Sequence, residues 1–149
     1  MADKPSIRRK GFQYERELIR LLWKKGFACL RAPASGSKAK RIIYPDLIAL
    51  KNGVILVFEV KVRSKLEPIY INKEKVNKLI EFCYRAGGLG FIAVKYLGAT
   101  NWRFIPIDRL EATSSGNYKI TKELVEKGLN INDLIRLTRK ESLLKYLNK

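Results

Sequence analysis

An Asn-Gly pair at residues 52–53, with an apolar run on either side, constrains the fold of this chain more than any other feature. Asn-Gly is the preferred sequence of a two-residue type I′ β-hairpin, because both positions of that turn need positive φ angles. The flanking segments, residues 46–51 and 54–63, are therefore predicted to be antiparallel strands with Lys51 opposite Val54. Both segments are apolar on both faces, which predicts that they lie inside a sheet rather than at its edge.

The predicted register brings three charged residues together at the far end of the hairpin. Counted outward from the turn, Asp46 lies directly opposite Glu59, and opposed residues share a face with Cβ atoms about 4.5–5.5 Å apart. Lys61 is two residues further along the strand, so its side chain is on the same face. Adjacent carboxylates repel each other, and a divalent cation would relieve the repulsion. The alternative is a structural ion-paired cluster in which Lys61 neutralises one acid.

A third carboxylate lies on the first predicted helix, residues 9–25. At about 100° per residue, Glu15 falls in the centre of the apolar stripe, whereas Glu17 falls on the opposite, solvated face. An unpaired carboxylate among apolar side chains is costly. A metal ion shared by Glu15, Asp46 and Glu59 accounts for all three acids. Alternatively, Glu15 stays hydrated near the start of the helix, where the helix dipole stabilises it.

Charge composition indicates the class of partner. The 31 Lys and Arg residues outnumber the 14 Asp and Glu residues, for a formal net charge of +17. A folded domain with that excess repels itself unless it binds a polyanion, and nucleic acid is the commonest one. A basic surface for anionic membranes is the weaker alternative, because no basic amphipathic helix has a Trp/Phe-rich face.

The absence of histidine excludes several chemistries, among them Ser-His-Asp triads, HExxH zinc sites and nucleases with a His base. Catalysis would then depend on carboxylates, lysine and a hard cation such as Mg²⁺, which prefers oxygen ligands. No apolar run approaches the roughly 20 residues of a membrane span, and no secretory signal is visible. We therefore expect a cytoplasmic protein without a membrane partner.

The remaining elements are predicted from periodicity and from Gly, Pro and Asn positions. Further strands are predicted at 27–31, 89–95 and 102–107, a helix at 72–86 with Asn72 as its N-cap, and one or two short helices within 121–147. This order predicts an α/β fold with a mixed central β-sheet flanked by helices. One domain spans residues 1–149, with a basic N-terminal arm (1–8), a mobile basic loop (32–45) and a C-terminal helical tail (about 121–149).

Pro45-Asp46, followed by Glu59-Val60-Lys61, is similar to the PD-(D/E)xK signature of restriction-like nucleases. With this motif, the chain resembles the archaeal Holliday junction resolvases, which have the restriction-endonuclease-like fold. The likeness continues in order along residues 8–107, through RKGFQYERELIRLL, GFACLRAPASGSK, PDLIALKNGVILVFEVKVR, LIEFCYRAGG, FIAVK and WRFIPI. The tail segments GNYKI and LNINDLIRL also resemble crenarchaeal members.

The resemblance implies a homodimeric, Mg²⁺-dependent endodeoxyribonuclease that resolves four-way junction DNA by symmetric cuts in recombination and repair. It implies 5′-phosphate products, and we expect Mn²⁺ to support activity as well. The catalytic residues that it implies are Glu15, Ser35, Asp46, Glu59 and Lys61. The metal ligands that it implies are Glu15, Asp46, Glu59 and the backbone carbonyl of Val60. Lys61 would orient the attacking water or stabilise charge that develops on the phosphate.

Basic residues on the arm, the loop and the strand after the motif are the candidates for DNA contact. They are Arg8, Arg9, Lys10, Arg16, Arg31, Lys38, Lys40, Arg41 and Arg63. Arg16 and Arg31 are included because they match basic residues of the family near the junction. One departure from the family stands out: Lys75 occupies a position where relatives often carry Gln, which leaves the role of this position in doubt.

Two other functions fit the same residues. One is a different restriction-like repair nuclease, which would cut linear duplex DNA. The other is a non-catalytic protein that binds junctions but does not cut them in Mg²⁺. The apolar pattern Leu143-Leu144…Tyr146-Leu147 is typical of a segment that contacts a sliding clamp or helicase, and equally of a final helix packed on the core.

Overall fold

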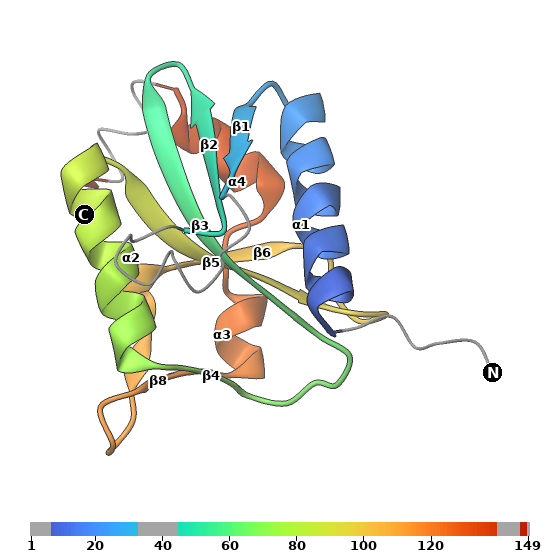
Figure 1. Cartoon of the computed structure of the whole chain (residues 1–149), viewed down its shortest axis with the longest axis vertical. Coiled ribbons are helices and arrows are strands. Elements are labelled where there is room, and N and C mark those ends of the chain that lie inside the picture. Colours follow the sequence, from blue (N-terminus) through green and yellow to red (C-terminus); the bar gives the residue numbers. More distant parts are fainter. Residues whose placement is uncertain (1–6, 33–44, 140–146, 149) are drawn as a thin grey trace.

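The computed structural model describes residues 7–32, 45–139 and 147–148, and a five-stranded mixed sheet runs through its centre (Figure 1). Its strands, in spatial order, are β1 (Ala28–Arg31), β2 (Leu47–Lys51), β3 (Val54–Arg63), β5 (Leu89–Tyr96) and β6 (Arg103–Pro106). The central pair, β3 and β5, is parallel, and the other neighbours are antiparallel. The predicted α/β class with a mixed sheet is confirmed.

The hairpin between β2 and β3 has the predicted turn and the predicted register over its five ladder pairs, and the predicted pair Asp46–Glu59 lies one step beyond the last of them. Asn52 and Gly53 both have positive φ angles, 52° and 76°, as a type I′ turn requires. Lys51 pairs with Val54, and the register continues without a bulge to Leu47 opposite Phe58. Since β1 covers one side of β2 and β5 one side of β3, neither strand is an edge, as the apolar pattern predicted.

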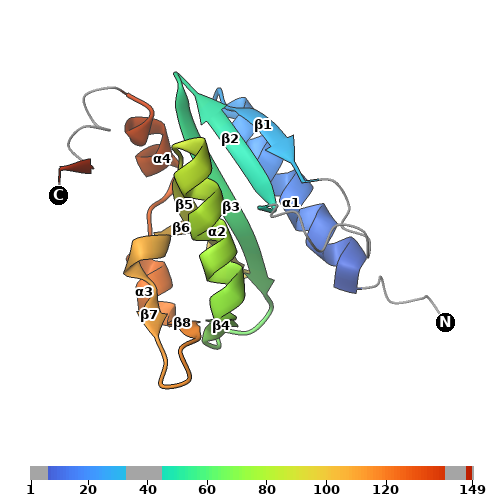
Figure 2. The same cartoon turned by 60° about the vertical axis from the view of Figure 1, so that its left-hand side comes forward.

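Helices cover both faces of the sheet, and the sheet divides the core into two layers (Figures 1 and 2). On one face lie α1 (Ile7–Lys24) and α4 (Ile131–Leu137), which bury Leu18, Leu22, Leu134 and Leu137. On the other lie α2 (Lys73–Ala86) and α3 (Lys122–Glu126), which bury Val76, Leu79, Cys83 and Val125. Residues alternate along β3 between the two layers, so neighbouring side chains of this strand serve opposite faces.

The crossover from β3 to β5 is the segment that brings α2 over the sheet. Asn72 is its N-cap, and its side chain accepts hydrogen bonds from the backbone N–H groups of Glu74 and Lys75. Gly87 ends the helix in the left-handed conformation, with φ 68°. The N-cap agrees with the prediction from sequence, and the contact of Lys75 with Glu59 shows that the first turn of α2 lies beside β3.

A second, three-stranded sheet was not predicted. It consists, in spatial order, of β4 (Ile69–Ile71), β8 (Tyr118–Ile120) and β7 (Glu111–Ala112). Strands β7 and β8 come after the short 3₁₀ helix η2 (Ile107–Arg109) in the chain. Strands of two or three residues are too short to show a period-2 pattern, which is why the sequence analysis missed them. Helix α1 begins at Ile7, so the predicted arm of residues 1–8 does not extend past residue 6.

No helix within the described ranges has the length and apolar character to cross a membrane. Most of the predicted loop, residues 33–44, and the tail residues 140–146 lie outside the described residues.

Candidate active site

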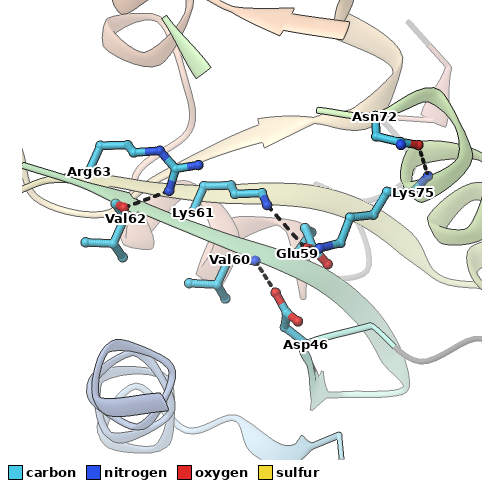
Figure 3. Close-up of polar contacts among 8 residues, drawn as sticks. All are labelled: Asp46, Glu59, Val60, Lys61, Val62, Arg63, Asn72 and Lys75. Carbon is cyan, nitrogen blue, oxygen red and sulfur yellow. Dashed lines mark hydrogen bonds and ion pairs between the residues drawn. The ribbon is translucent and has the colours of Figure 1, made fainter. Parts of the chain in front are cut away.

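The site forms where β2 ends and β3 continues (Figure 3). β3 has ten residues and β2 has five, so beyond Phe58 the backbone of β3 has no partner from β2. Asp46, one residue before β2, occupies that place: its backbone N–H donates to the carbonyl of Phe58 at 3.0 Å, and its Oδ2 accepts from the N–H of Val60 at 2.7 Å. The carboxylate of Asp46 is therefore held against the edge of β3 at the predicted motif.

Glu59 is the most enclosed acid of the site, with 6% of its surface exposed. Two lysines face the same carboxylate oxygen: Lys75 Nζ is 2.8 Å from Glu59 Oε1, and Lys61 Nζ is 3.8 Å from it (Figure 3). Lys61 comes from β3, two residues further along, whereas Lys75 reaches across from the first turn of α2. The prediction that Glu59 and Lys61 share a face is confirmed by this contact.

Burial and crowding of charge shift the pKa values of these groups. Burial raises the pKa of Glu59, and the nearby Asp46 carboxylate raises it further. Lys75 and Lys61 lower this pKa, but it stays raised overall. The pKa of Lys61 is lowered by burial and by the ammonium of Lys75. Partial burial by itself lowers the pKa of Lys75, but the carboxylates of Glu59 and Asp46 leave it raised overall. Lys75 is thus the cation that these two acids stabilise most directly.

Glu15 lies on α1 and is more enclosed than Glu17, as the helical periodicity predicted. Its side chain is 14% exposed, and its Oε2 accepts a hydrogen bond from Arg31 Nε at 3.0 Å. The Arg31 guanidinium also lies over the ring of Phe12, 4.4 Å from the centroid. Burial raises the pKa of Glu15, and the Asp46 carboxylate raises it further, so the Glu15 and Asp46 carboxylates are close enough to repel each other.

The three acids approach one another from two faces of the sheet. Val60 and Val62 point toward the α1 layer, where Glu15 lies, while Glu59 and Lys61 point toward α2 (Figure 3). Asp46 lies at the end of β2 between them. In the described ranges no three His, Cys, Asp or Glu side chains are arranged as a group that could hold a metal ion. The shared metal ion therefore stays a prediction.

The donor set nevertheless suits a hard divalent cation. It offers carboxylate oxygens only, which Mg²⁺ prefers, and Asp46 raises the pKa of both Glu15 and Glu59. Such mutual repulsion is what a cation would relieve, and in this structure Arg31 and Lys75 relieve it instead. The donor types therefore fit Mg²⁺, and the ion would have to replace Arg31 and Lys75 and draw the three carboxylates together.

Glu17 lies on the more solvated side of α1, as predicted, with 42% of its side chain exposed, but its partners were not predicted. This side chain does not point freely into solvent: it forms an ion pair with Lys95 of β5 and accepts a hydrogen bond from Trp102 Nε1 at 3.3 Å. Helical phase alone placed Glu17 opposite the apolar stripe of α1, but it says nothing of a lysine that extends from the neighbouring sheet. Lys95 also lies over the Trp102 ring, so the three side chains form one cluster.

The other predicted site residues are only partly described. Arg16 and Arg63 are exposed, and Arg63 donates to the carbonyl of Val62 at 2.9 Å. Ser35, Lys38, Lys40 and Arg41 lie outside the described residues. Arg8, Arg9 and Lys10 belong to α1, but their side chains are likewise outside the described part.

Lys75 is the site residue that the sequence analysis did not assign. One signal was available: Lys75 follows the N-cap Asn72 by three residues, and a cation in the first turn opposes the helix dipole. Its contact with Glu59 depends on how α2 crosses the sheet, which no local pattern predicts.

Comparison with known sequences places the site in a family. The sequence model described as "Archaeal holliday junction resolvase (hjc)" matches residues 6–143, nearly the whole chain. The chain belongs to the archaeal Holliday junction resolvase family. Asp46, Glu59 and Lys61 lie inside the matched range, as does Glu15.

Members of the resolvase family from several archaea are similar over most of their length. The chain is 47% identical over 131 residues to the crossover junction endodeoxyribonuclease Hjc of Sulfurisphaera tokodaii, covering 88% of this chain and 89% of the relative. It is 41% identical to the Hjc of Methanocaldococcus jannaschii, covering 85% and 96%. The solved structure of Archaeoglobus fulgidus Hjc, a Holliday junction resolvase, superposes with a TM-score of 0.75 at 34% identity, covering 85% of this chain and 95% of that one.

Proposed function

We propose that this chain is a structure-selective DNA endonuclease that resolves four-way Holliday junctions by symmetric, metal-dependent phosphodiester hydrolysis. Membership of the resolvase family along residues 6–143 carries the proposal, because all four motif side chains are present in it. The geometry supports the proposal: Lys61 lies 3.8 Å from Glu59, and Asp46 accepts a hydrogen bond from the N–H of Val60, the residue between them.

The proposed cofactor is Mg²⁺, held by the carboxylates of Glu15, Asp46 and Glu59 and the carbonyl of Val60. We expect Mn²⁺ to support activity in its place. When bound, such an ion lowers the pKa of a water molecule and polarises the scissile phosphate. The hydrogen bond from Val60 N–H keeps Asp46 oriented toward this position. Lys61, largely shielded and 3.8 Å from Glu59, presents a positive charge where negative charge develops on the phosphate. The products are expected to carry 5′ phosphates.

The substrate is predicted to be recognised mainly through its phosphates. The net charge of +17 favours binding to any DNA, but four duplex arms around one point present more phosphates to one protein surface than a linear duplex does. We expect the protein to bind a four-way junction much more tightly than a linear duplex of equal length, with an affinity that falls steeply as salt rises. A competition gel shift at several salt concentrations measures both the preference for the junction and the dependence of the affinity on salt.

A cleavage assay in Mg²⁺, with EDTA as the control, then separates the candidate functions. Paired cuts in the junction and an uncut linear duplex support a resolvase. Equal cutting of both DNAs would indicate another restriction-like repair nuclease, and tight junction binding without Mg²⁺-dependent cutting would indicate a non-catalytic binding protein.

We further propose a homodimer. A resolvase makes two symmetry-related cuts, and two sites related by a two-fold axis meet this requirement, whereas one chain supplies a single set of motif residues. We expect light scattering to give twice the chain mass of 17.2 kDa at micromolar concentration. A monomer under the conditions in which the protein cuts junctions would contradict the dimer.

A further inference from the structure

Lys75 makes the shortest contact to Glu59, yet neither the motif nor helix stability accounts for it. Its Nζ is 2.8 Å from Glu59 Oε1, a full ångström nearer than the motif lysine Lys61 at 3.8 Å. It lies in the first turn of α2, where the helix dipole favours an acid and disfavours a cation. The contact to Glu59, rather than the helix, is therefore what stabilises a positive charge here.

The two lysines differ in how freely they can leave Glu59. The side chain of Lys61 is 18% exposed, whereas that of Lys75 is 51% exposed on a flexible four-carbon stem. Figure 3 shows Lys75 reaching Glu59 from α2, while Lys61 extends along β3. Lys75 can consequently swing away from the site without disturbing the sheet.

A divalent cation bound to Glu59 and Asp46 would meet the ammonium of Lys75 at close range. Like charges separated by a few ångströms repel strongly in a partly buried site, where screening by water is weak. The carboxylate of Glu59 therefore cannot bind Lys75 and the metal ion at the same time without strong electrostatic repulsion between them.

We propose that Lys75 is a displaceable counter-ion that neutralises Glu59 in the metal-free protein and competes with the divalent metal ion for it. This inference rests on the proposed metal site. Lys75 acts as a positioning residue, because it holds the buried carboxylate of Glu59 in place until the metal ion binds. It also lowers the affinity of the DNA-free protein for the metal ion.

The test is metal binding without DNA, measured by isothermal titration calorimetry with Mn²⁺ on the full chain. We expect Lys75→Gln to bind Mn²⁺ about tenfold more tightly than the wild-type protein, because the competing charge is gone. The rise in melting temperature that Mn²⁺ produces should be larger in Lys75→Gln, since Glu59 loses its nearest cation in the metal-free state. Lys75→Arg, which keeps the charge, should behave like the wild type.

Lys78→Gln is the matched control, because it removes the same charge from an exposed position on the same helix. Equal tightening in Lys75→Gln and Lys78→Gln would show a general effect of net charge and overturn the inference. Unchanged or weaker Mn²⁺ binding in Lys75→Gln would overturn it as well. A wild-type protein that binds no Mn²⁺ by either measurement would instead contradict the metal site itself.

Discussion

Replacing Asp46 by asparagine is expected to reduce junction cleavage in Mg²⁺ by about a thousandfold or more, which corresponds to about 4 kcal/mol of activation free energy. Asparagine has the same shape and keeps an oxygen that accepts the hydrogen bond from Val60 N–H, so the strand end should keep its geometry. What it removes is the negative charge, and with it the proposed metal ligand. Single-turnover cleavage of a labelled junction at saturating protein measures the loss.

Binding and folding should survive the same substitution. Junction affinity, measured by gel shift in EDTA, should be unchanged or tighter, because one negative charge facing the phosphates is gone. Asp108→Asn is the matched control: Asp108 is an exposed aspartate in the 3₁₀ turn η2, outside the motif. It should leave cleavage almost intact. Near wild-type cutting by Asp46→Asn would refute the metal assignment, whereas equal losses in both variants would indicate an effect of charge alone.

Glu15→Gln is expected to reduce cleavage by about a hundredfold or more, equivalent to about 3 kcal/mol. Glu15 lies on α1, the Asp46 carboxylate raises its pKa, and both carboxylates are proposed to hold one metal ion. Glutamine preserves the size of the side chain and its hydrogen bond from Arg31, so the helix should pack as before. Cleavage under single turnover, with thermal unfolding in parallel, separates lost chemistry from lost stability.

The choice of control for Glu15 depends on the tertiary structure. Glu17 is unsuitable, because Glu17→Gln would remove the negative charge that pairs with Lys95 beside Trp102. Glu81 on α2 is better: its side chain is 44% exposed, and among the described residues its ion pair is with Arg85 of the same helix, at 2.8 Å. Exposed pairs of this spacing contribute about 0.3–0.5 kcal/mol, so Glu81→Gln should leave cleavage almost unchanged. If Glu15→Gln cuts as fast as Glu81→Gln, Glu15 is not a metal ligand.

Local rules were enough to predict the half of the site that lies on one hairpin. Asn52-Gly53 determines the turn, the turn determines the register, and the period of two along a strand then brings Glu59 and Lys61 to one face with Asp46 at the strand end. These are short-range effects of backbone sterics and hydrogen bonding, and they act over few residues whatever surrounds them. Helical periodicity likewise predicted that Glu15 is more enclosed than Glu17.

Contacts between distant segments could not be obtained in that way. Lys75 reaches Glu59 because the parallel pairing of β3 with β5 requires a crossover, and the packing of α2 on the sheet aims its first turn at the site. Lys95 reaches Glu17 because α1 packs beside β5 and Trp102. Glu15 pairs with Arg31 and Glu59 pairs with Lys75, so the two acids have separate cationic partners that neither helix phase nor strand alternation could predict. Packing of whole elements against one another decides which long side chains meet, since the free energy of such contacts depends on burial and charge from residues far apart in sequence.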